Sequence, residues 1–553
     1  MTKFKGIGAL ILMAICAALI AKYLYPGLVP ILNQDSYQYL SVADNALHGK
    51  IGYTSIIHFD TERSLGTMPA PLVTFPPGYA LVTALVSRIG ISTETAGLAL
   101  SVAATLACIP LLIWLGARAG FSGMLSCALA GLFVTNATVI VFGASVMTEA
   151  LFMLLSLLGV ACIMQAKVRN QNGLGWYWVA AGLSFAAAYF ARYAGMFFVA
   201  GLFILVIYYA VTANWAMMKG HLIVFLISGS AVLSAAARNI YLVGNWRGGN
   251  DKVVSNPLLQ TIGKALQGTN VLLLGPGSGS PGGTTLVRLA CILLFLGGMV
   301  LLLTAGLRWS KTGGKGEVRT QYTPIATEIA ILSAVYMACL FYAGLKSVID
   351  YGDPRYFLPV APLFFLLVGI FITRWGSGLR VRPSGLRTAA FAFLSASAAI
   401  CIGLNLLLFR LPNAHAASPL EVDFATSKVG EAQFSAKIRD LVGPDGVVIS
   451  NNGQNVAHVV ARPTISLVGP TFSSVEWTEQ ALRDVATQFR AKAIVIYVPE
   501  GEQWNDDNYI PSSFIRRLAN NQPPQWMKLE FRSKHLLVYV PSISGDAAWA
   551  AAQ

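Results

Sequence analysis

The chain has 553 residues, of which 55% are hydrophobic and only 12% are charged. Soluble globular chains carry roughly 25% charged residues, so this composition excludes an ordinary soluble fold over most of the chain. The net charge of +14 does not indicate nucleic-acid binding, because the basic residues are dispersed among short loops, where membrane topology explains them. The seven cysteines all fall inside apolar runs, so neither a disulfide framework nor a C-x-x-C zinc pair is indicated.

Long apolar runs recur along the first 410 residues, and several reach the roughly 20 residues needed to cross the hydrocarbon core of a bilayer. They predict an all-α polytopic membrane bundle of about 11 transmembrane helices. The first run lacks a clear cleavage site and is interpreted as a retained helix. A stretch at 76–90 is too short to span and is expected as an interfacial or half-inserted helix. The predicted spans are 7–25, 96–116, 121–140, 147–165, 175–191, 193–211, 221–237, 286–307, 324–344, 356–374 and 388–409.

The distribution of basic residues orients this bundle. With the N-terminus inside, the internal loops are dense in Lys and Arg and hold one acid, Glu317, as the positive-inside rule expects. Two long loops, 26–95 and 238–285, then lie outside. The second contains a Gly- and Pro-rich stretch at 275–283 with no Gly-Lys-Ser/Thr ending, so it is interpreted as a flexible loop and not as a phosphate-binding P-loop.

The composition changes after Arg410. Strand-like runs at 446–450, 493–498 and 536–540 alternate with helix-like segments near 475–490 and 512–520, which is typical of a small α/β domain. We therefore expect a transmembrane module at 1–411 and a soluble α/β domain at 412–553. The odd number of spans places this domain on the external side.

Two acids in the external segments could carry chemistry. The first long loop opens with Asn33-Gln-Asp-Ser-Tyr-Gln-Tyr39, and a helix over 35–47 would place Asp35 and Tyr39 on one face. A carboxylate there could take the proton of a sugar acceptor hydroxyl, or could simply cap an interfacial helix. Glu149 starts the fourth predicted span. It could complement the helix dipole, orient the acceptor beside Asp35, or bind a divalent metal ion with it.

Three external arginines lie next to helix ends, against the topology bias. Arg192 sits in a short turn between two predicted spans, Arg238 ends the seventh, and Arg355 begins the tenth. Each could reach individually to lipid headgroups. Together they could bind a phosphate or diphosphate, because the planar guanidinium group donates paired, charge-assisted hydrogen bonds.

The order and sidedness of these motifs resemble the GT-C glycosyltransferases. The closest likeness is to the bacterial branch around protein mannosyltransferase and lipid A aminoarabinose transferase, and it covers roughly residues 1–410. The motifs that carry it are Asp35 with Tyr39 after the first span, Pro-Pro-Gly-Tyr at 76–79, Thr-Glu at 148–149, Arg-Asn at 238–239 and Pro-Arg-Tyr-Phe-Leu-Pro at 354–359.

The resemblance implies a shared core of spanning helices and a first external loop with interfacial helices. It implies a catalytic acid at Asp35 and a second acid at Glu149. The expected substrate-binding residues are Tyr39, Tyr79, Arg192, Arg238, Arg355 and Tyr356. The chain also departs from its relatives: the aminoarabinose transferases have a Lys where this chain has Thr74-Phe75, and the metal-binding D-x-D of oligosaccharyltransferases is not found. The sequence indicates no particular cofactor, and a divalent metal ion at Asp35 and Glu149 is left open.

The expected function is transfer of a sugar, with inversion, from a polyprenyl-phosphate donor to an envelope acceptor on the external face. The acceptor could be a glycolipid, a polysaccharide or a protein, and the other partner is the bilayer. The expected location is the bacterial inner membrane, with a cytoplasmic N-terminus and an extracytoplasmic C-terminal domain. The alternatives are a lipid-linked sugar flippase without chemistry and a ligase or polymerase that uses a diphosphate donor. A flippase would line its pathway with intramembrane polar residues, whereas the predicted spans carry few charges.

Overall fold

The computed structural model describes residues 2–24, 30–57, 66–169, 175–246, 248, 255–274, 325–346, 353–378, 428–469, 475–498, 510–533 and 535–542. The chain forms two compact units. The first, which we call the helical unit, comprises Met1–Ile31, Leu98–Leu233 and Ser255–Ala414. The second, the sheet unit, comprises Leu32–Gly97, Ser234–Val254 and His415–Gln553.

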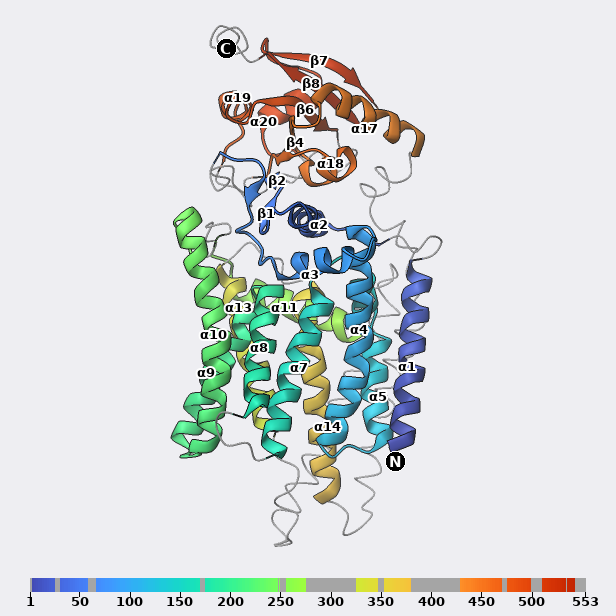
Figure 1. Ribbon diagram of the computed structural model, residues 1–553, viewed down its shortest axis with the longest axis vertical. Coiled ribbons are helices and arrows are strands. Elements are labelled where there is room, and N and C mark those ends of the chain that lie inside the picture. The colour runs from blue at the N-terminus through green and yellow to red at the C-terminus, as the bar shows by residue number, and fades with distance from the viewer. Residues whose placement is uncertain are drawn as a thin grey trace. The chain divides into compact units, whose positions relative to one another are not determined.

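The long helices of the helical unit run side by side (Figure 1). Helix α7 packs against α8, α9 against α13, and α1 against α5. Helices α4 and α10 lie mostly in this unit; the first residues of α4, up to Gly97, and the last residues of α10, from Ser234, belong to the sheet unit. The elements are α1 (Thr2–Tyr23), α4 (Thr93–Arg118), α5 (Gly123–Val134), α6 (Ala137–Gly143), α7 (Glu149–Val168), α8 (Trp176–Ala191), α9 (Gly195–Val211), α10 (Trp215–Val243), α11 (Leu258–Leu274), α13 (Ala326–Lys346), the 3-10 turn η2 (Pro354–Tyr356) and α14 (Ala361–Gly378).

Within the described ranges, five helices are long and apolar enough to cross a membrane, and a sixth span is added if α5 and α6 count as one. Helix α9 and the Ala361–Thr373 part of α14 are apolar but shorter than a span, and α8 has 16 residues. The predicted spans 286–307 and 388–409 lie outside the described residues. The structure therefore has a multi-span helical bundle, and the count of eleven stays a prediction.

The sequence predicts one helix over 121–140, whereas the structure has two, bent by 64°. The cause is Asn136, whose side chain accepts hydrogen bonds from the amides of Thr138 and Val139 and so starts α6 as a new helix. Asn is among the strongest N-cap residues because its short side chain reaches these unpaired amides. The stretch predicted as too short to span forms α3 (Gly78–Ser87), a helix of 10 residues.

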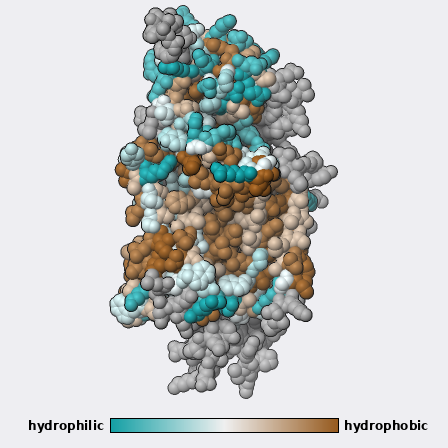
Figure 2. Space-filling model, in the orientation of Figure 1, coloured by the Kyte–Doolittle hydropathy of each residue, from teal (hydrophilic) through white to brown (hydrophobic). Residues whose placement is uncertain are grey.

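The helical unit exposes large apolar side chains on its outer helices. Leu10 and Ile11 of α1 and Leu233 of α10 are more than half exposed, and apolar surface is extensive over these helices (Figure 2). Large continuous apolar surfaces are rare on proteins that are surrounded by water. They are the surface that a bilayer covers, so the structure is that of a multi-pass membrane protein.

The sheet unit is built on six strands in the order β2-β5-β4-β6-β8-β7. Strands β2, β5, β4 and β6 are parallel, and β8 and β7 continue the sheet in antiparallel fashion. The strands are β2 (Ile56–Ile57), β4 (Val447–Ser450), β5 (Thr464–Ser466), β6 (Ala491–Tyr497), β7 (Met527–Arg532) and β8 (Leu536–Pro541), with a separate hairpin of β1 (Tyr53–Thr54) and β3 (Ala70–Pro71). The helices are α2 (Gln34–Leu47), α3, α17 (Lys428–Val442), α18 (Gly453–Val460), α19 (Glu479–Gln488) and α20 (Ser513–Ala519).

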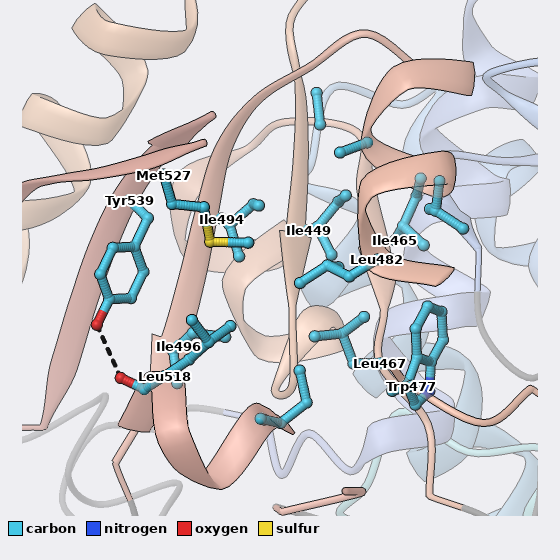
Figure 3. Packing of buried hydrophobic residues seen from close by; sticks show 14 of the residues in the cluster. Ile449, Ile465, Leu467, Trp477, Leu482, Ile494, Ile496, Leu518, Met527 and Tyr539 are labelled. Carbon is cyan, nitrogen blue, oxygen red and sulfur yellow. Dashed lines mark hydrogen bonds between the residues drawn. The ribbon is translucent and has the colours of Figure 1, made fainter. Parts of the chain in front are cut away.

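Helices cover both faces of this sheet. Successive residues of a strand point to opposite faces, so Ile449 of β4 packs with α19 and α20 while Val448 packs with α17 and α18. The first of these cores is dominated by branched aliphatic and aromatic side chains, with the Tyr539 hydroxyl donating to the Leu518 carbonyl at 2.7 Å (Figure 3). Helices on both faces of a largely parallel sheet make an α/β arrangement.

The sheet unit is larger than the domain that the composition change at residue 412 predicts. Strand β2 comes from the first long loop and pairs with β5, Ile56 opposite Thr464 and Ile57 opposite Ile465. Ile57 and Ala70 of that loop also belong to the core between the sheet and α19 and α20. The first loop and the C-terminal segment therefore fold as one compact unit.

Candidate active site

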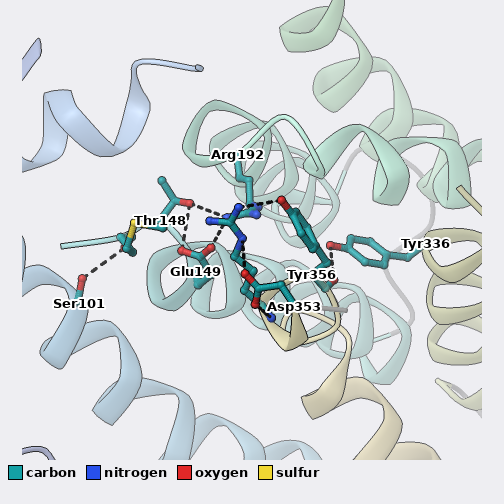
Figure 4. Close-up of polar contacts among 9 residues, drawn as sticks. Ser101, Thr148, Glu149, Arg192, Tyr336, Asp353 and Tyr356 are labelled. Carbon is teal, nitrogen blue, oxygen red and sulfur yellow. Dashed lines mark hydrogen bonds and ion pairs between the residues drawn. The ribbon is translucent and has the colours of Figure 1, made fainter. Parts of the chain in front are cut away.

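Glu149 is the first residue of α7 and is fully buried. The unpaired amides and the dipole at a helix N-terminus stabilise an acid in this position. A second stabilising charge comes from Arg192, whose Nη1 forms an ion pair with Oε1 of Glu149 and also donates to Oγ1 of Thr148 at 3.2 Å (Figure 4). The buried carboxylate is therefore paired, which a buried charge requires.

The local backbone aims Arg192 at this acid. Arg192 caps the C-terminus of α8 in an extended conformation, and α9 begins at Gly195 after a very short turn. A Cβ atom at Gly195 would lie 2.5 Å from Cα of Tyr189, which is closer than packing permits. The turn that carries Arg192 therefore requires glycine at this position.

A second acid and a second arginine join the cluster from the segment before α14. Oδ1 of Asp353 accepts a hydrogen bond from the backbone amide of Arg355 at 2.9 Å and so caps η2. Oδ2 of Asp353 lies 3.0 Å from Nε of Arg355. Burial raises the pKa of the Asp353 carboxyl, and the neighbouring Arg355 opposes this shift. The aspartate thus holds its arginine through both the backbone and the side chain.

Tyr356 connects the two arginines. The guanidinium carbon of Arg192 lies 5.6 Å from the centroid of the Tyr356 ring, and that of Arg355 lies 4.9 Å from it. The Tyr356 hydroxyl also accepts a hydrogen bond from Nη2 of Arg355 at 2.8 Å. The Tyr336 hydroxyl donates to the backbone carbonyl of Tyr356 at 3.3 Å. A cation over an aromatic face is attracted by the ring quadrupole, so one tyrosine fixes two guanidinium groups close together.

The start of α7, the end of α8 and the segment before α14 thus meet at one end of the helical unit. This site contains Thr148, Glu149, Arg192, Asp353 and Tyr356, which are labelled in Figure 4, and Arg355, which contacts Asp353 and Tyr356. Its two carboxylates balance its two guanidinium groups. Guanidinium groups held in this way can donate hydrogen bonds to an oxyanion such as a phosphate, in the paired geometry that suits this fork.

The other predicted site residues lie in the sheet unit. Asp35 is in the first turn of α2, where Asn33 and Ser36 form a capping box. Tyr39 is buried, and its ring makes edge-to-face contacts with Phe75 and Tyr79, both at 5.4 Å between centroids. Helix α2 is thereby attached to the Pro-Pro-Gly-Tyr segment at the start of α3.

Two of these residues are engaged by the backbone of their own unit. Tyr79 is fully buried, and its hydroxyl donates to the Gly97 carbonyl at 3.1 Å. Arg238 donates from Nη1 to the Leu72 carbonyl at 2.8 Å and from Nη2 to the Gly52 carbonyl at 3.4 Å. These bonds tie Arg238 to one end of the β1–β3 hairpin, where Gly52 precedes β1 and Leu72 follows β3.

Comparison with known proteins gives a partial sequence match and a fold. A family model described as dolichyl-phosphate-mannose-protein mannosyltransferase matches residues 80–245. A search of curated proteins finds no match. The chain is similar in structure to ArnT from Cupriavidus metallidurans bound to undecaprenyl phosphate, with a TM-score of 0.54 and 14% identity over 97% of this chain and 98% of that chain. The apo state of the same protein gives a TM-score of 0.56 and 12% identity over the same shares.

A second similar structure is the archaeal oligosaccharyltransferase AglB from Archaeoglobus fulgidus in complex with an inhibitory peptide and a dolichol-phosphate. It has a TM-score of 0.51 and 13% identity over 98% of this chain and 77% of that chain. The chain has the GT-C glycosyltransferase fold. The resemblance that the motifs indicated is confirmed, both by this fold and by the partial match to a mannosyltransferase family.

The family match covers only some of the candidate site residues. Glu149, Arg192 and Arg238 lie inside the segment that matches the family model, whereas Asp35 and Arg355 lie outside it. Among the residues that the structure describes, no group of three or more His, Cys, Asp or Glu side chains could hold a metal ion. The two acids considered as metal ligands, Asp35 and Glu149, belong to different units, Asp35 to the sheet unit and Glu149 to the helical unit.

The sequence did not single out Thr148 or Asp353 as residues of this candidate site. Asp353 stands two residues before Arg355 and directly before a proline, a pattern in which the side chain caps the following turn. This local pattern is enough to predict that Asp353 caps the turn. The ion pair between Asp353 and Arg355 could be found only from the positions of the side chains in the structure.

Proposed function

We propose that this protein is a GT-C glycosyltransferase that moves a sugar from a polyprenyl-phosphate donor to an envelope acceptor on the external face of the membrane. The observation that carries the proposal is the paired cluster of Glu149, Arg192, Asp353 and Arg355, joined by Tyr356, at one end of the helical unit. The similar ArnT structure is bound to undecaprenyl phosphate, and the AglB structure is in complex with a dolichol-phosphate. Paired arginines suit such a lipid phosphate.

The proposed chemistry is a single displacement with inversion. The acceptor oxygen attacks the anomeric carbon, and the bond from that carbon to the phosphate oxygen breaks on the opposite side through an oxocarbenium-like state. The phosphate leaves with the bonding electron pair. Arg192 and Arg355 stabilise this developing charge, as preorganised donors do in other reactions that expel an oxyanion. Asp35 takes the proton of the acceptor hydroxyl.

The remaining residues receive supporting roles. Glu149 holds Arg192 in place, Tyr356 lies against the donor headgroup, and Tyr39 and Tyr79 support the helix that carries Asp35. We assign Arg238 to holding the first loop, because its Nη1 and Nη2 groups donate to the carbonyls of Leu72 and Gly52. A divalent metal ion at Asp35 or Glu149 is not needed for these steps.

The proposed organisation follows the sequence analysis. Residues 1–411 hold the transmembrane module, and the α/β domain at 412–553 folds with Leu32–Gly97 and Ser234–Val254 in the sheet unit. We place the N-terminus in the cytoplasm and the C-terminal segment outside the inner membrane of a bacterium. The density of Lys and Arg in the predicted internal loops supports this orientation.

The test is transfer of a labelled sugar from polyprenyl phosphate by the purified full-length protein in detergent. Asp35→Asn is expected to abolish transfer, because the proton acceptor is lost. The affinity for the donor is expected to stay within about twofold of the parent, and the melting temperature within about 2 °C. The control is Asp440→Asn, an exposed acid on α17, which is expected to leave transfer unchanged. Full activity of Asp35→Asn would remove Asp35 from the mechanism.

The same protein in proteoliposomes distinguishes the flippase. A transferase forms labelled product in detergent, where there is no membrane to cross. Movement of the lipid-linked sugar between leaflets without product in either assay would replace the proposed function by transport. Product formation from a diphosphate-linked donor alone would instead indicate a ligase or polymerase.

A further inference from the structure

The C-terminal segment of the chain has extensive contacts with the first loop inside the sheet unit. The backbone amide of Thr464 donates to the Ser55 carbonyl at 2.9 Å, next to the parallel pairing of β2 with β5. The loop thereby adds an edge strand to the C-terminal sheet, and Ile57 enters the core of that sheet. Strand addition fixes the path of the loop through main-chain bonds as well as through side chains.

Helix α18 packs directly on α2, the helix that carries Asp35. The ring of His458 lies 5.0 Å from the ring of Tyr37, centroid to centroid. Tyr37 is buried and forms a small core with Ile56 and Ala457, with Leu32 packed against it. Tyr37 is two residues from Asp35 on the same helix, so this contact acts close to the acid.

His458 also reaches the start of α4. Its Nε2 lies 3.2 Å from Oε1 of Glu94, and Asp44 of α2 is a second acid within its electrostatic reach. Burial lowers the pKa of the His458 imidazole, while Glu94 and Asp44 oppose the shift. His48, on the turn after α2, interacts in turn with Asp44. His458 therefore touches α2 through Tyr37 and reaches Glu94 at the same time.

Helix α2 is held on a second side by other residues. Tyr39 contacts Phe75 and Tyr79, whereas Tyr37, which lies about 200° away around a helix of 3.6 residues per turn, contacts His458. Two contacts on opposite sides restrict both the tilt of the helix and its rotation about its axis. The direction of the Asp35 side chain depends on both.

We propose that the C-terminal sheet is a positioning module for α2, and that His458 is the positioning residue that couples α18 to the helix of the proton acceptor. The proposal rests on the function proposed above, in which Asp35 takes the acceptor proton. His458 touches neither donor nor acceptor in this scheme. Its loss affects turnover through the orientation of α2 and leaves donor binding unchanged.

The experiment compares His458→Ala and His458→Gln in the full-length protein, with His535→Ala as the matched control. His535 is the same residue type in the same unit, in the turn between β7 and β8, and its carbonyl accepts from Val498. Two quantities are measured: amide hydrogen exchange across residues 34–47, and kcat and KM for the labelled donor.

His458→Ala is expected to speed exchange in α2 about tenfold, from the combined loss of the ring contact with Tyr37 and the polar contact between Nε2 and the Glu94 carboxylate. The kcat falls by a similar factor and KM for the donor stays within about twofold, because the lost contacts act on the acid and not on the phosphate. His458→Gln restores part of the effect, since its amide can still donate to Glu94. His535→Ala changes neither quantity.

Two results would overturn the proposal. One is unchanged exchange and unchanged kcat in both His458 variants. The other is faster exchange throughout the sheet unit in both variants, which would make His458 a general support of the fold. The exchange readout does not depend on activity, so loss of α2 protection supports the positioning role even if Asp35→Asn retains transfer and the proposed function fails.

Discussion

Arg192 and Glu149 form an ion pair between two different helices, and the Glu149 carboxylate is fully buried. The arginine comes from the end of α8 and the acid from the start of α7. A buried charge is tolerated only when it is paired and hydrogen-bonded. The pair therefore contributes to the stability of the fold and also positions Arg192 in the candidate site. Substitutions must distinguish an effect on stability from an effect on transfer.

Removing one partner of this pair is expected to be worse for stability than removing both. Glu149→Gln leaves Arg192 with a neutral acceptor, and Arg192→Met leaves a buried carboxylate unpaired, at a cost of about 3–5 kcal/mol in the free energy of unfolding. The double variant Glu149→Gln/Arg192→Met leaves no unpaired charge and is expected to recover most of that loss. The measurement is thermal unfolding in detergent.

Transfer activity is expected to follow a different order. The double variant lacks a phosphate-binding guanidinium and stays inactive although it is folded. A double variant that recovers both stability and transfer would show that Arg192 is purely structural. A double variant no more stable than the single ones would show that the pair is not the source of the instability.

The sequence predicted the positions of the charged helix ends because these signals are local. Thr148-Glu149 precedes an apolar run, and Arg192 falls between two such runs, so hydropathy alone places both at helix boundaries. Their contact could not be predicted in this way. It depends on α7 packing against α8 and on the close turn at Gly195.

Two features were hidden from sequence reasoning for physical reasons. The break between α5 and α6 comes from one capping residue, Asn136, inside an apolar stretch, and an average over about twenty residues conceals it. Strand β2 has two residues, Ile56 and Ile57, too few to show an alternating pattern. Its pairing with β5 is a tertiary contact, so the unit formed by the first loop and the C-terminal segment was predicted as two separate parts.

Arg355→Lys tests whether the second guanidinium binds the donor phosphate. Lysine keeps the charge but cannot contact Asp353 and Tyr356 with separate nitrogens as Arg355 does at 3.0 and 2.8 Å. We expect KM for the donor to rise about tenfold with a smaller change in kcat, because a point charge replaces a planar fork. Asp353→Asn is expected to act in the same direction. Steady-state kinetics with a labelled donor provide the measurement.

The control for this prediction is Arg439→Lys. Arg439 lies on α17, and its Nη1 donates to the Val459 carbonyl at 3.4 Å, far along the sequence from any proposed phosphate contact. It is expected to leave both kinetic constants unchanged. If Arg355→Lys behaves like this control, Arg355 is not a ligand of the donor.

Gly195→Ala tests the turn that directs Arg192. The added methyl group would meet the backbone of Tyr189 at 2.5 Å, so the turn must shift and Arg192 moves away from Glu149. We expect a loss of about 1–3 kcal/mol in stability from overpacking together with a clear loss of transfer. Unfolding and activity are measured on the same preparation.

Gly263→Ala is the matched control, because a methyl group at Gly263 in α11 meets nothing within 4 Å. Alanine is a better helix former than glycine by roughly 0.5–1 kcal/mol, so this variant should be as stable as the parent or more so, with full activity. Equal behaviour of the two variants would mean that the close approach at Gly195 does not constrain the site.

The stability of the sheet unit is expected to fall as the pH drops below the ordinary pKa of histidine, about 6.5. Burial lowers the pKa of His458 in the folded state against the opposing charges of Glu94 and Asp44. Between the two pKa values the unfolded chain binds a proton that the folded chain does not, so protonation favours unfolding in this window. Above pH 6.5 both states are neutral at this residue and the contribution is constant.

The raised pKa of Asp44 acts in the opposite sense, because the folded chain binds a proton at a pH where this aspartate is still ionised in the unfolded chain. The measurement is the rate of amide exchange in residues 34–47 and 453–460 from pH 7.5 to 5.0, corrected for intrinsic exchange. His458→Gln, which does not titrate, is expected to flatten the profile in both segments. A profile of the same slope in parent and variant would assign the pH dependence to groups other than His458.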